Sequence, residues 1–165
     1  MPDAKRTWYG AFATLFGIGR AGRMPGTLGS AAAFLILLPF GGINIFALAA
    51  VILLGTVTAD MYAKERGAED PSEVVIDEVA GSWISMYGLD ASSAIAAFFL
   101  FRVIDIVKPF PVDSAEKLPG GVGIMADDIC GGIIVNVILR AVAWFFSVLF
   151  AGGFSAIGGY LGVGG

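Results

Sequence analysis

Acidic side chains occur as adjacent pairs at two places in the sequence, Asp77-Glu78 and Asp127-Asp128. Each pair adjoins an apolar run, where neighbouring carboxylates repel each other and lose solvation unless a cation lies with them. A metal site is therefore the preferred interpretation of both pairs. The alternatives are a solvated helix edge for Asp77-Glu78 and a helix cap for Asp127-Asp128, although a single acid is enough for a cap.

A third polar segment combines acid and base. Arg102, Asp105 and Lys108 are spaced three apart and would lie along one face of a helix. They could form only an ion-pair ladder at a membrane edge. The functional interpretation is that Arg102 and Lys108 hold a phosphate, while Asp105 binds a metal or assists a water molecule. Pro109 and Pro111 follow, so the helix should end near Lys108.

Two further segments, 70–73 and 23–30, can be explained as helix starts without a functional role. Asp70 and Glu73 match a helix start, in which Asp70 is the cap, a proline follows it and an acid stands at the third position. The segment 23–30 is typical of a turn and a helix cap. It could also contact a phosphate or lipid headgroup through a helix N-terminus, Thr27 and Arg23.

Apolar segments must position these residues. Of the 165 residues, 57% are hydrophobic and 15% are charged, against about a quarter charged in a typical soluble domain. A small soluble domain buries only about two-thirds of its chain, so the surplus predicts contact with lipid. Apolar helices are expected near 28–40, 43–59, 79–107, with an interruption at residues 88–90, and 129–150. The sequence thus predicts an all-α, polytopic membrane protein with one domain, residues 1–165.

The positive charges predict how the chain is oriented. Lysine and arginine accumulate on the cytoplasmic side of membrane proteins, and here they flank the first two apolar segments and precede the last one. The polar segments are therefore expected at the cytoplasmic face, with the uncharged tail after residue 150 outside. No signal-peptide pattern follows the N-terminus closely, so a retained, cytoplasmic N-terminus is expected.

Residue types that are rare or absent narrow the chemistry. The chain has no histidine, which excludes an imidazole base and a phosphohistidine intermediate. Its single cysteine, Cys130, excludes a disulfide framework and a cysteine-rich metal site. The net charge of −4 argues against a nucleic-acid partner. Oxygen ligands alone favour Mg²⁺ or Mn²⁺ over Zn²⁺, and such an ion near arginine and lysine suits phosphoryl chemistry.

Four motifs, in order, resemble those of the phosphatidylglycerophosphatase A family of bacterial membranes. They are Pro25-Gly26-Thr27 with Gly29-Ser30; Asp70-Pro71 with Val75-Ile76-Asp77-Glu78 and Gly81; Phe101-Arg102 with Asp105 and Lys108-Pro109-Phe110-Pro111; and Gly120-Gly121-Val122-Gly123-Ile124-Met125 with Asp127-Asp128. The resemblance spans residues 22–132. Phe110 is a mild departure, because tryptophan is common there in similar proteins.

The resemblance implies a Mg²⁺-dependent enzyme of the bacterial inner membrane that converts phosphatidylglycerophosphate, its phospholipid substrate, to phosphatidylglycerol and phosphate. On this hypothesis the metal ligands are Asp77, Glu78, Asp105, Asp127 and Asp128. The catalytic residues are Asp105 and Asp128, and the substrate-binding residues are Arg23, Thr27, Arg102 and Lys108. The oligomeric state is left open.

Competing functions make different demands on the sequence. Lipid phosphatases of the acid-phosphatase type need catalytic histidines, and a cysteine phosphatase needs an arginine six residues after its nucleophile, where Asn136 follows Cys130. The remaining alternative is a small transporter or ion-binding membrane protein with buried carboxylates. That alternative predicts acids at mid-membrane depth, whereas most acids here border the apolar runs.

Overall fold

The computed structural model describes residues 7–21, 24–37 and 42–160 of the chain. Within these ranges the regular structure is helical and contains no strand, which confirms the predicted all-α class. The elements are α1 (Trp8–Ala13), the 3-10 helix η2 (Ile18–Arg20), α2 (Pro25–Leu37), α3 (Ile45–Arg66), α4 (Ile76–Met86), α5 (Ala91–Val107), α6 (Val112–Ala115) and α7 (Gly120–Tyr160).

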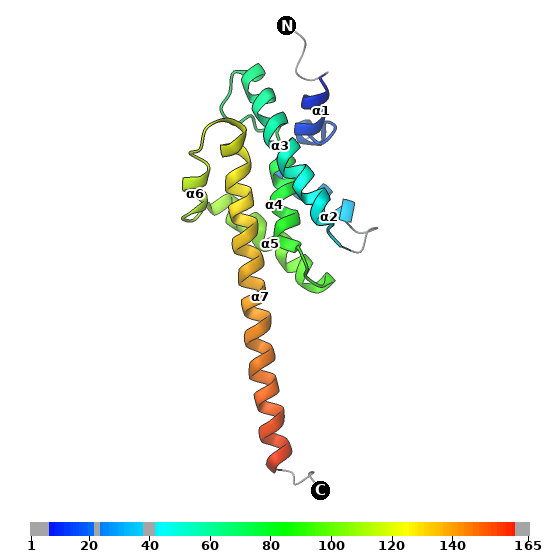
Figure 1. Ribbon diagram of the computed structural model, residues 1–165, viewed down its shortest axis with the longest axis vertical. Helices are drawn as coiled ribbons and strands as arrows, with labels where there is room; N and C mark the ends of the chain where they lie inside the picture. Colours follow the sequence, from blue (N-terminus) through cyan, green and yellow to red (C-terminus); the bar gives the residue numbers. More distant parts are fainter. Residues whose placement is uncertain (1–6, 22–23, 38–41, 161–165) are drawn as a thin grey trace.

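Helix α7 runs along the long axis of the molecule (Figure 1). It has 41 residues, which at 1.5 Å per residue make a rod of about 60 Å. The other helices gather around its N-terminal half, and its C-terminal part extends beyond them. Helices α4 and α3 pack most extensively against it. The polar segments of the sequence are therefore assembled against one half of a single long helix.

Glycines let α4 and α7 approach each other closely. A Cβ atom at Gly132 of α7 would lie 2.4 Å from the carbonyl oxygen of Gly81 on α4, and one at Gly81 would lie 2.6 Å from the carbonyl oxygen of Asp128. A larger side chain at either position would force the helices apart. Asp128, Gly132, Asn136 and Arg140 are spaced four apart, and all four contact α4 or the turn that follows it.

Side-chain caps and glycine explain several helix ends. Asn44 accepts hydrogen bonds from free backbone N–H groups in the first turn of α3, and Asp90 does the same for α5. Gly67 ends α3 in the left-handed conformation, with a φ of 65°. The interruption predicted at residues 88–90 is the turn between α4 and α5.

Two helices, α3 and the part Gly120–Phe150 of α7, are long and apolar enough to cross a membrane. Only 28% of the most apolar window of α3 and 6% of that of α7 is buried inside the protein. Their apolar side chains therefore mostly face outward, unlike those of a soluble core helix, which indicates a membrane-associated protein. Helices α2, α4 and α5 have 13, 11 and 17 residues, fewer than the roughly 20 that a span needs.

The predicted start of the last helix near residue 129 is wrong. Helix α7 begins at Gly120 and continues to Tyr160, past the expected end at residue 150. Its first turn contains glycines because it lies tightly against α3: a Cβ at Gly121 would be 2.0 Å from the carbonyl oxygen of Thr56. Asp127 and Asp128 consequently lie two turns inside α7, so neither of them caps it.

The other helix boundaries differ as well. Helix α2 begins earlier than the predicted 28–40 segment, whose residues 38–40 lie outside the described ranges. Helix α3 extends well past the predicted end at residue 59. Helix α4 begins at Ile76, so the prediction that Asp70 caps this helix is wrong. The backbone N–H of Val75 donates to the carbonyl oxygen of Ala13 (2.9 Å), which ties the preceding turn to α1.

Candidate active site

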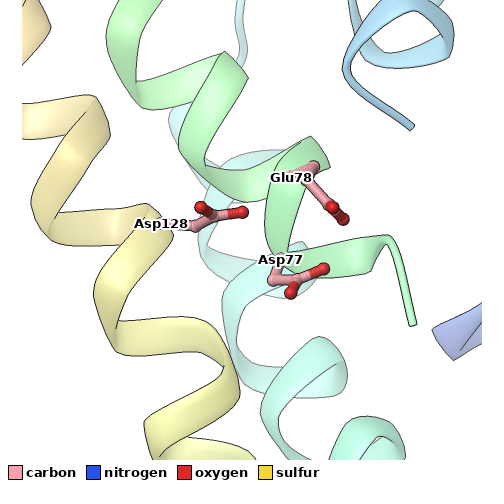
Figure 2. A group of neighbouring side chains, drawn as sticks. All are labelled: Asp77, Glu78 and Asp128. Atoms are coloured by element: carbon pink, nitrogen blue, oxygen red, sulfur yellow. The ribbon is translucent and has the colours of Figure 1, made fainter. Parts of the chain in front are cut away.

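Three carboxylates from two helices meet between α4 and α7. Asp77 and Glu78 lie in the first turn of α4, and Asp128 projects from α7 toward them (Figure 2). One oxygen of each group lies within 4.8 Å of the others. The two acid pairs therefore contribute to a single site, here called the carboxylate trio.

The N-terminus of α4 stabilises the charges of Asp77 and Glu78 only slightly. Asp77 and Glu78 lie in the first turn of α4, and not about two turns inside a helix capped by Asp70. The positive end of the helix dipole favours an ionised carboxylate there. At exposed sites this effect is worth no more than about 1 kcal/mol. This is small compared with the several kcal/mol that burial of an unpaired carboxylate costs. The trio thus needs a stronger compensating charge.

Two oxygens of the trio, Oδ1 of Asp77 and Oε2 of Glu78, are buried and have no hydrogen-bond partner among the described residues. Burial raises the pKa of Asp77 well above its usual range, and the charge of Glu78 adds to this. Burial likewise raises the pKa of Glu78 to about 8, with a contribution from Asp128. Such groups require either a proton or a cation. Carboxylate oxygens without nitrogen or sulfur donors are ligands that a hard divalent cation prefers.

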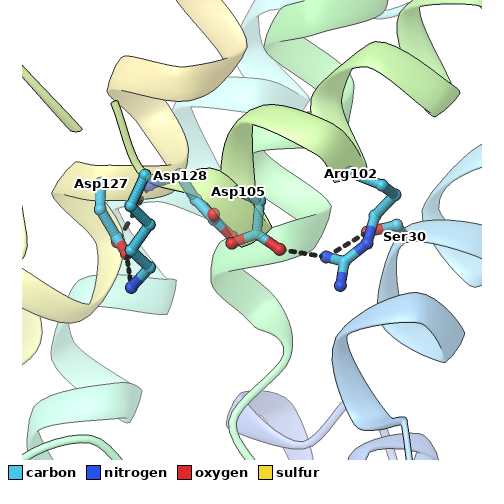
Figure 3. Close-up of polar contacts among 6 residues, drawn as sticks. Ser30, Arg102, Asp105, Asp127 and Asp128 are labelled. Atoms are coloured by element: carbon cyan, nitrogen blue, oxygen red, sulfur yellow. Dashed lines mark hydrogen bonds and ion pairs between the residues drawn. The ribbon is translucent and has the colours of Figure 1, made fainter. Parts of the chain in front are cut away.

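Arg102 of α5 reaches the same place. Its Nη1 forms an ion pair with Oδ2 of Asp105 (2.5 Å) and donates a longer hydrogen bond to the hydroxyl of Ser30 on α2 (3.4 Å), as Figure 3 shows. The Nε of Arg102 is buried and has no partner in the described part of the chain. The ion pair expected within this helix is present, and the guanidinium still has an unpaired N–H that could bind an anion.

Lys108 leaves the helical face that Arg102 and Asp105 share. It follows the last residue of α5 with a φ of 45°, and its ammonium contacts Asp127 (2.9 Å) and Glu116 (2.8 Å). Burial alone would lower the pKa of Lys108, but the hydrogen bonds that its ammonium donates to Asp127 and Glu116 outweigh burial and raise the pKa above its usual value. Lys108 therefore stays charged and holds Asp127.

A cavity of about 200 Å³ joins these groups. It is lined by Pro25, Gly26, Asp70, Ser72, Val74, Asp77, Glu78, Arg102, Asp105, Lys108, Asp127 and Asp128. All five predicted metal ligands and two of the four predicted substrate-binding residues are thus brought together. The volume is below the 300–1,000 Å³ typical of sites for drug-sized ligands, and it suits part of a headgroup better than a whole lipid.

Gly26 contributes to the site through the absence of a side chain. A Cβ there would lie 2.5 Å from Oε1 of Glu78 and 3.0 Å from Nη2 of Arg102. The glycine therefore allows the first turn of α2, whose N–H groups favour anions, to approach both residues. Thr27 is half-buried and does not line the cavity. Arg23 lies outside the described residues.

Asp70 was missed as a site residue because it was interpreted as a cap. It lines the cavity, and burial together with the nearby charge of Asp127 raises its pKa. The run 74–76 could have signalled this, since three consecutive β-branched residues are poor helix formers within the first two turns after a cap. Glu73, the other acid assigned to that helix start, pairs with Arg66 instead (2.7 Å) and lies off the cavity.

Comparison with known proteins gives consistent matches. The family model described as phosphatidylglycerophosphatase A matches residues 11–143. The chain is 36% identical over 144 residues to phosphatidylglycerophosphatase A of Escherichia coli, covering 81% of this chain and 84% of the relative. It is 36% identical over 139 residues to the protein of that name from Haemophilus influenzae, covering 79% and 85% of the two chains.

A third relative carries a different name. A protein of Bacteroides thetaiotaomicron, provisionally named a phosphatidylinositol-3-phosphatase, is 37% identical over 145 residues, which are 79% of this chain and 91% of the relative. No solved structure matches the chain.

Proposed function

The chain belongs to the phosphatidylglycerophosphatase A family, and we propose that it hydrolyses phosphatidylglycerophosphate to phosphatidylglycerol and phosphate. The relatives from E. coli and H. influenzae carry the name of this activity. The region that matches the family contains every residue that lines the cavity. The candidate site therefore lies within the region that matches the family model.

The observation that carries this proposal is the charge balance of the cavity. Six carboxylic acids and two cations, Arg102 and Lys108, line it. A phosphate would meet a net negative surface there unless a divalent cation were bound with it. Arg102 and Lys108 each pair with one acid of the cavity, Asp105 and Asp127, and their positive charges could also attract an anionic ligand. A cation site with arginine and lysine beside it suits a phosphate monoester.

We propose Mg²⁺ as the cofactor. Asp77, Glu78 and Asp128 would hold it, with Asp105 and Asp127 as further ligands or as partners of those ligands. The fit rests on the unpaired buried oxygens of Asp77 and Glu78 and on a donor set that contains only carboxylates. When bound, such an ion neutralises charge on a transferring phosphoryl group and makes a bound water more acidic.

The side chains around the trio would bind and orient the substrate. Arg102 can donate its unpaired Nε–H to a phosphate oxygen, and the permanently charged Lys108 adds attraction from the far end of α5. Asp105 is held in place by Arg102, and we assign it the task of orienting the attacking water. Asp128 is assigned to the catalytic centre through its place in the trio.

We further propose that the protein is a single-domain, multi-pass protein of the bacterial inner membrane whose cavity faces the cytoplasm. Lys64 and Arg66 lie in the last turn of α3. Lysine and arginine accumulate at the cytoplasmic ends of membrane helices. From this end the apolar surfaces of α3 and α7 extend away. A headgroup phosphate could then reach the cavity while the acyl chains stay in the bilayer.

The test uses purified full-length protein in mixed micelles that contain phosphatidylglycerophosphate. We expect release of inorganic phosphate with Mg²⁺, none with excess chelator, and recovery when Mg²⁺ or Mn²⁺ is restored. Release that continues unchanged in chelator would overturn the metal site. A failure to release phosphate from any lipid phosphate monoester, with folded protein and Mg²⁺, would overturn the activity.

The relative from B. thetaiotaomicron makes phosphatidylinositol 3-phosphate the informative competing substrate. Both lipids carry a phosphate monoester on a headgroup, so the same cavity chemistry could act on either. We expect the larger kcat/KM for phosphatidylglycerophosphate. A clear preference for the inositol lipid would change the assigned substrate but not the assigned chemistry.

A further inference from the structure

The contact between α4 and α7 has a polar end far from the carboxylate trio. Asn136 Nδ2 donates to the carbonyl oxygens of Ser85 (3.1 Å) and Tyr87 (2.9 Å), and Arg140 Nη2 donates to the carbonyl oxygen of Tyr87 (2.8 Å). Arg140 Nε also donates to Oδ1 of Asn136 (2.7 Å). These two side chains, here called the Asn136–Arg140 clamp, bind the carbonyl groups at the C-terminal end of α4.

Each part of the clamp compensates a cost. The last carbonyl groups of a helix have no partner within the helix, and leaving them unpaired in an apolar environment is expensive. Arg140 lies within the apolar segment Gly120–Phe150, where a charge needs partners, and a cation at a helix C-terminus is favourable. Gly88 has a φ of 66°, and a Cβ there would lie 2.7 Å from Arg140 Nη2. The turn is thus shaped to admit the guanidinium.

The clamp and the trio lie at opposite ends of the contact between α4 and α7. Asp128, Gly132 and Arg140 belong to one row of residues spaced four apart, which is inclined to the helix axis, and the 12 residues from Asp128 to Arg140 correspond to about 18 Å of helix. Helix α4, with its 11 residues, is about 16 Å long. The contact is therefore fixed at its two ends, with the close approach of Gly81 and Gly132 between them.

Sliding α4 along α7 by a single residue would move the acids of α4 by about 1.5 Å relative to Asp128. Ligand distances in metal sites hold to about ±0.2 Å, so such a shift would spoil a shared metal site. The glycine contact lets the helices lie close together but offers no directional bond along their axes. The hydrogen bonds of the clamp supply that restraint.

We propose that Asn136 and Arg140 are positioning residues, which hold Asp77 and Glu78 opposite Asp128 by fixing the C-terminal end of α4 on α7. The inference rests on the proposed metal site, and neither residue lines the cavity. A purely structural role would make the same hydrogen bonds stabilise the fold without affecting the affinity of the trio for a cation. Metal affinity of the folded protein therefore separates the two roles.

The experiment measures Mn²⁺ binding to the detergent-solubilised full chain by electron paramagnetic resonance, which detects free Mn²⁺. We expect Arg140→Met and Asn136→Leu to raise the dissociation constant about tenfold, in the range seen when groups that orient metal ligands are removed. Arg140→Lys keeps the charge but loses the bridge to Asn136, so about a threefold rise is expected. Ser147→Ala is the matched control, because this hydroxyl donates within its own helix, to Trp144, and affinity should not change.

Size-exclusion profiles and helical circular dichroism identify the folded fraction, to which each affinity refers. Unchanged Mn²⁺ affinity in both clamp variants, with a lower melting temperature, would overturn the positioning role and leave the metal site standing. No Mn²⁺ binding by the wild-type protein would overturn the metal site, and the inference with it. If the methionine and leucine variants do not fold, Arg140→Lys decides: affinity equal to that of Ser147→Ala overturns the proposal.

Discussion

The two ends of the α4–α7 contact treat their polar groups in opposite ways. At the clamp, Asn136 and Arg140 meet backbone carbonyls at 2.8 to 3.1 Å. At the trio, Asp77 and Glu78 each bury an oxygen that has no partner among the described residues. Buried polar groups in folded proteins are normally satisfied. The contrast therefore separates polar residues that join the two helices from those that we propose bind a cation.

The severest test of this contrast removes one charge from the trio. Asp128→Asn keeps the shape of the side chain but loses a carboxylate beside Asp77 and Glu78. We expect phosphate release to fall by about 10³-fold, the scale of losing several kcal/mol of electrostatic stabilisation. The fold should survive, because removing one of several repelling charges relieves strain between them. Lipid phosphatase assays with a size-exclusion check measure both effects.

Asp113→Asn is the control for that experiment. Asp113 pairs with Lys117 (3.2 Å) on the surface and does not line the cavity. Its replacement should leave phosphate release within about twofold of wild type, since exposed ion pairs contribute little. Equal activity of the Asp128 and Asp113 variants would remove the trio from the mechanism.

A smaller effect is expected when the space beside the trio is filled. Gly26→Ala would bring a methyl group within 2.5 Å of Glu78 and 3.0 Å of Arg102, so at least one of these side chains must move. A displacement of about 1 Å in a catalytic site can cost about 10²-fold in rate. We expect a loss of kcat/KM of that order, measured on phosphatidylglycerophosphate, with normal expression and folding.

Gly67→Ala serves as the comparison, because it is expected to lower stability without lowering activity. Gly67 has open space around it but adopts a left-handed φ of 65°, so alanine there should lower stability by about 1–2 kcal/mol. Phosphate release by the folded enzyme should be unchanged. Full activity of Gly26→Ala would contradict the arrangement of Glu78 and Arg102 around α2.

The unpaired trio should also make stability depend on pH. Burial raises the pKa of Glu78 to about 8, above the usual value near 4.3. The folded state then binds the proton more tightly than the unfolded state does. The stability contributed by this group is full below the ordinary pKa and is lost as the pH rises through about 8. In chelator, the melting temperature should fall between pH 5 and pH 9.

Glu78→Gln is expected to flatten this decline, because glutamine does not titrate. Mn²⁺ added at pH 8 should recover stability in the wild-type protein, since a metal binds the deprotonated carboxylate. Differential scanning fluorimetry in detergent measures both. A wild-type melting temperature that rises across the same pH window in chelator would contradict the assignment.

The smallest effect is expected at an acid outside both ends of the contact. Glu73 pairs with Arg66 at 2.7 Å, with 25% of its side chain exposed. Glu73→Gln should change the free energy of unfolding by less than about 1 kcal/mol and leave phosphate release unaltered. A large loss of activity would mean that the cavity extends further than its lining residues indicate.

The parts that sequence could predict are those that depend on local composition and spacing. Outward-facing apolar helices follow from the abundance of hydrophobic residues. The adjacent acids, Arg102 and Lys108, which the sequence marks as candidate site residues, line one cavity. For Asp127-Asp128 the sequence favours a metal site over a helix cap, and the cap is excluded because both residues lie two turns inside α7. Whether they bind metal stays a prediction.

The parts that sequence could not predict depend on packing between distant segments. Glycine is a poor helix former, yet residues 120–123 are helical because α3 lies close against them. Asp70 matched a local cap pattern, but a hydrogen bond between Val75 and Ala13 holds this segment in a turn. Gly26 has no side chain that could suggest a chemical role. Its contribution is the space that it leaves for Glu78 and Arg102, which are remote from it in sequence.

Helix α7 joins the candidate catalytic acid and the membrane-anchoring surface in one rigid element. More than thirty residues of α7 follow Asp128, about 48 Å of helix against a hydrocarbon core of about 30 Å. No loop lies between them to absorb a vertical displacement. The depth of the cavity is therefore set by where the bilayer holds this rod, and membrane thickness becomes a determinant of how well the carboxylates and the plane of lipid phosphates are aligned.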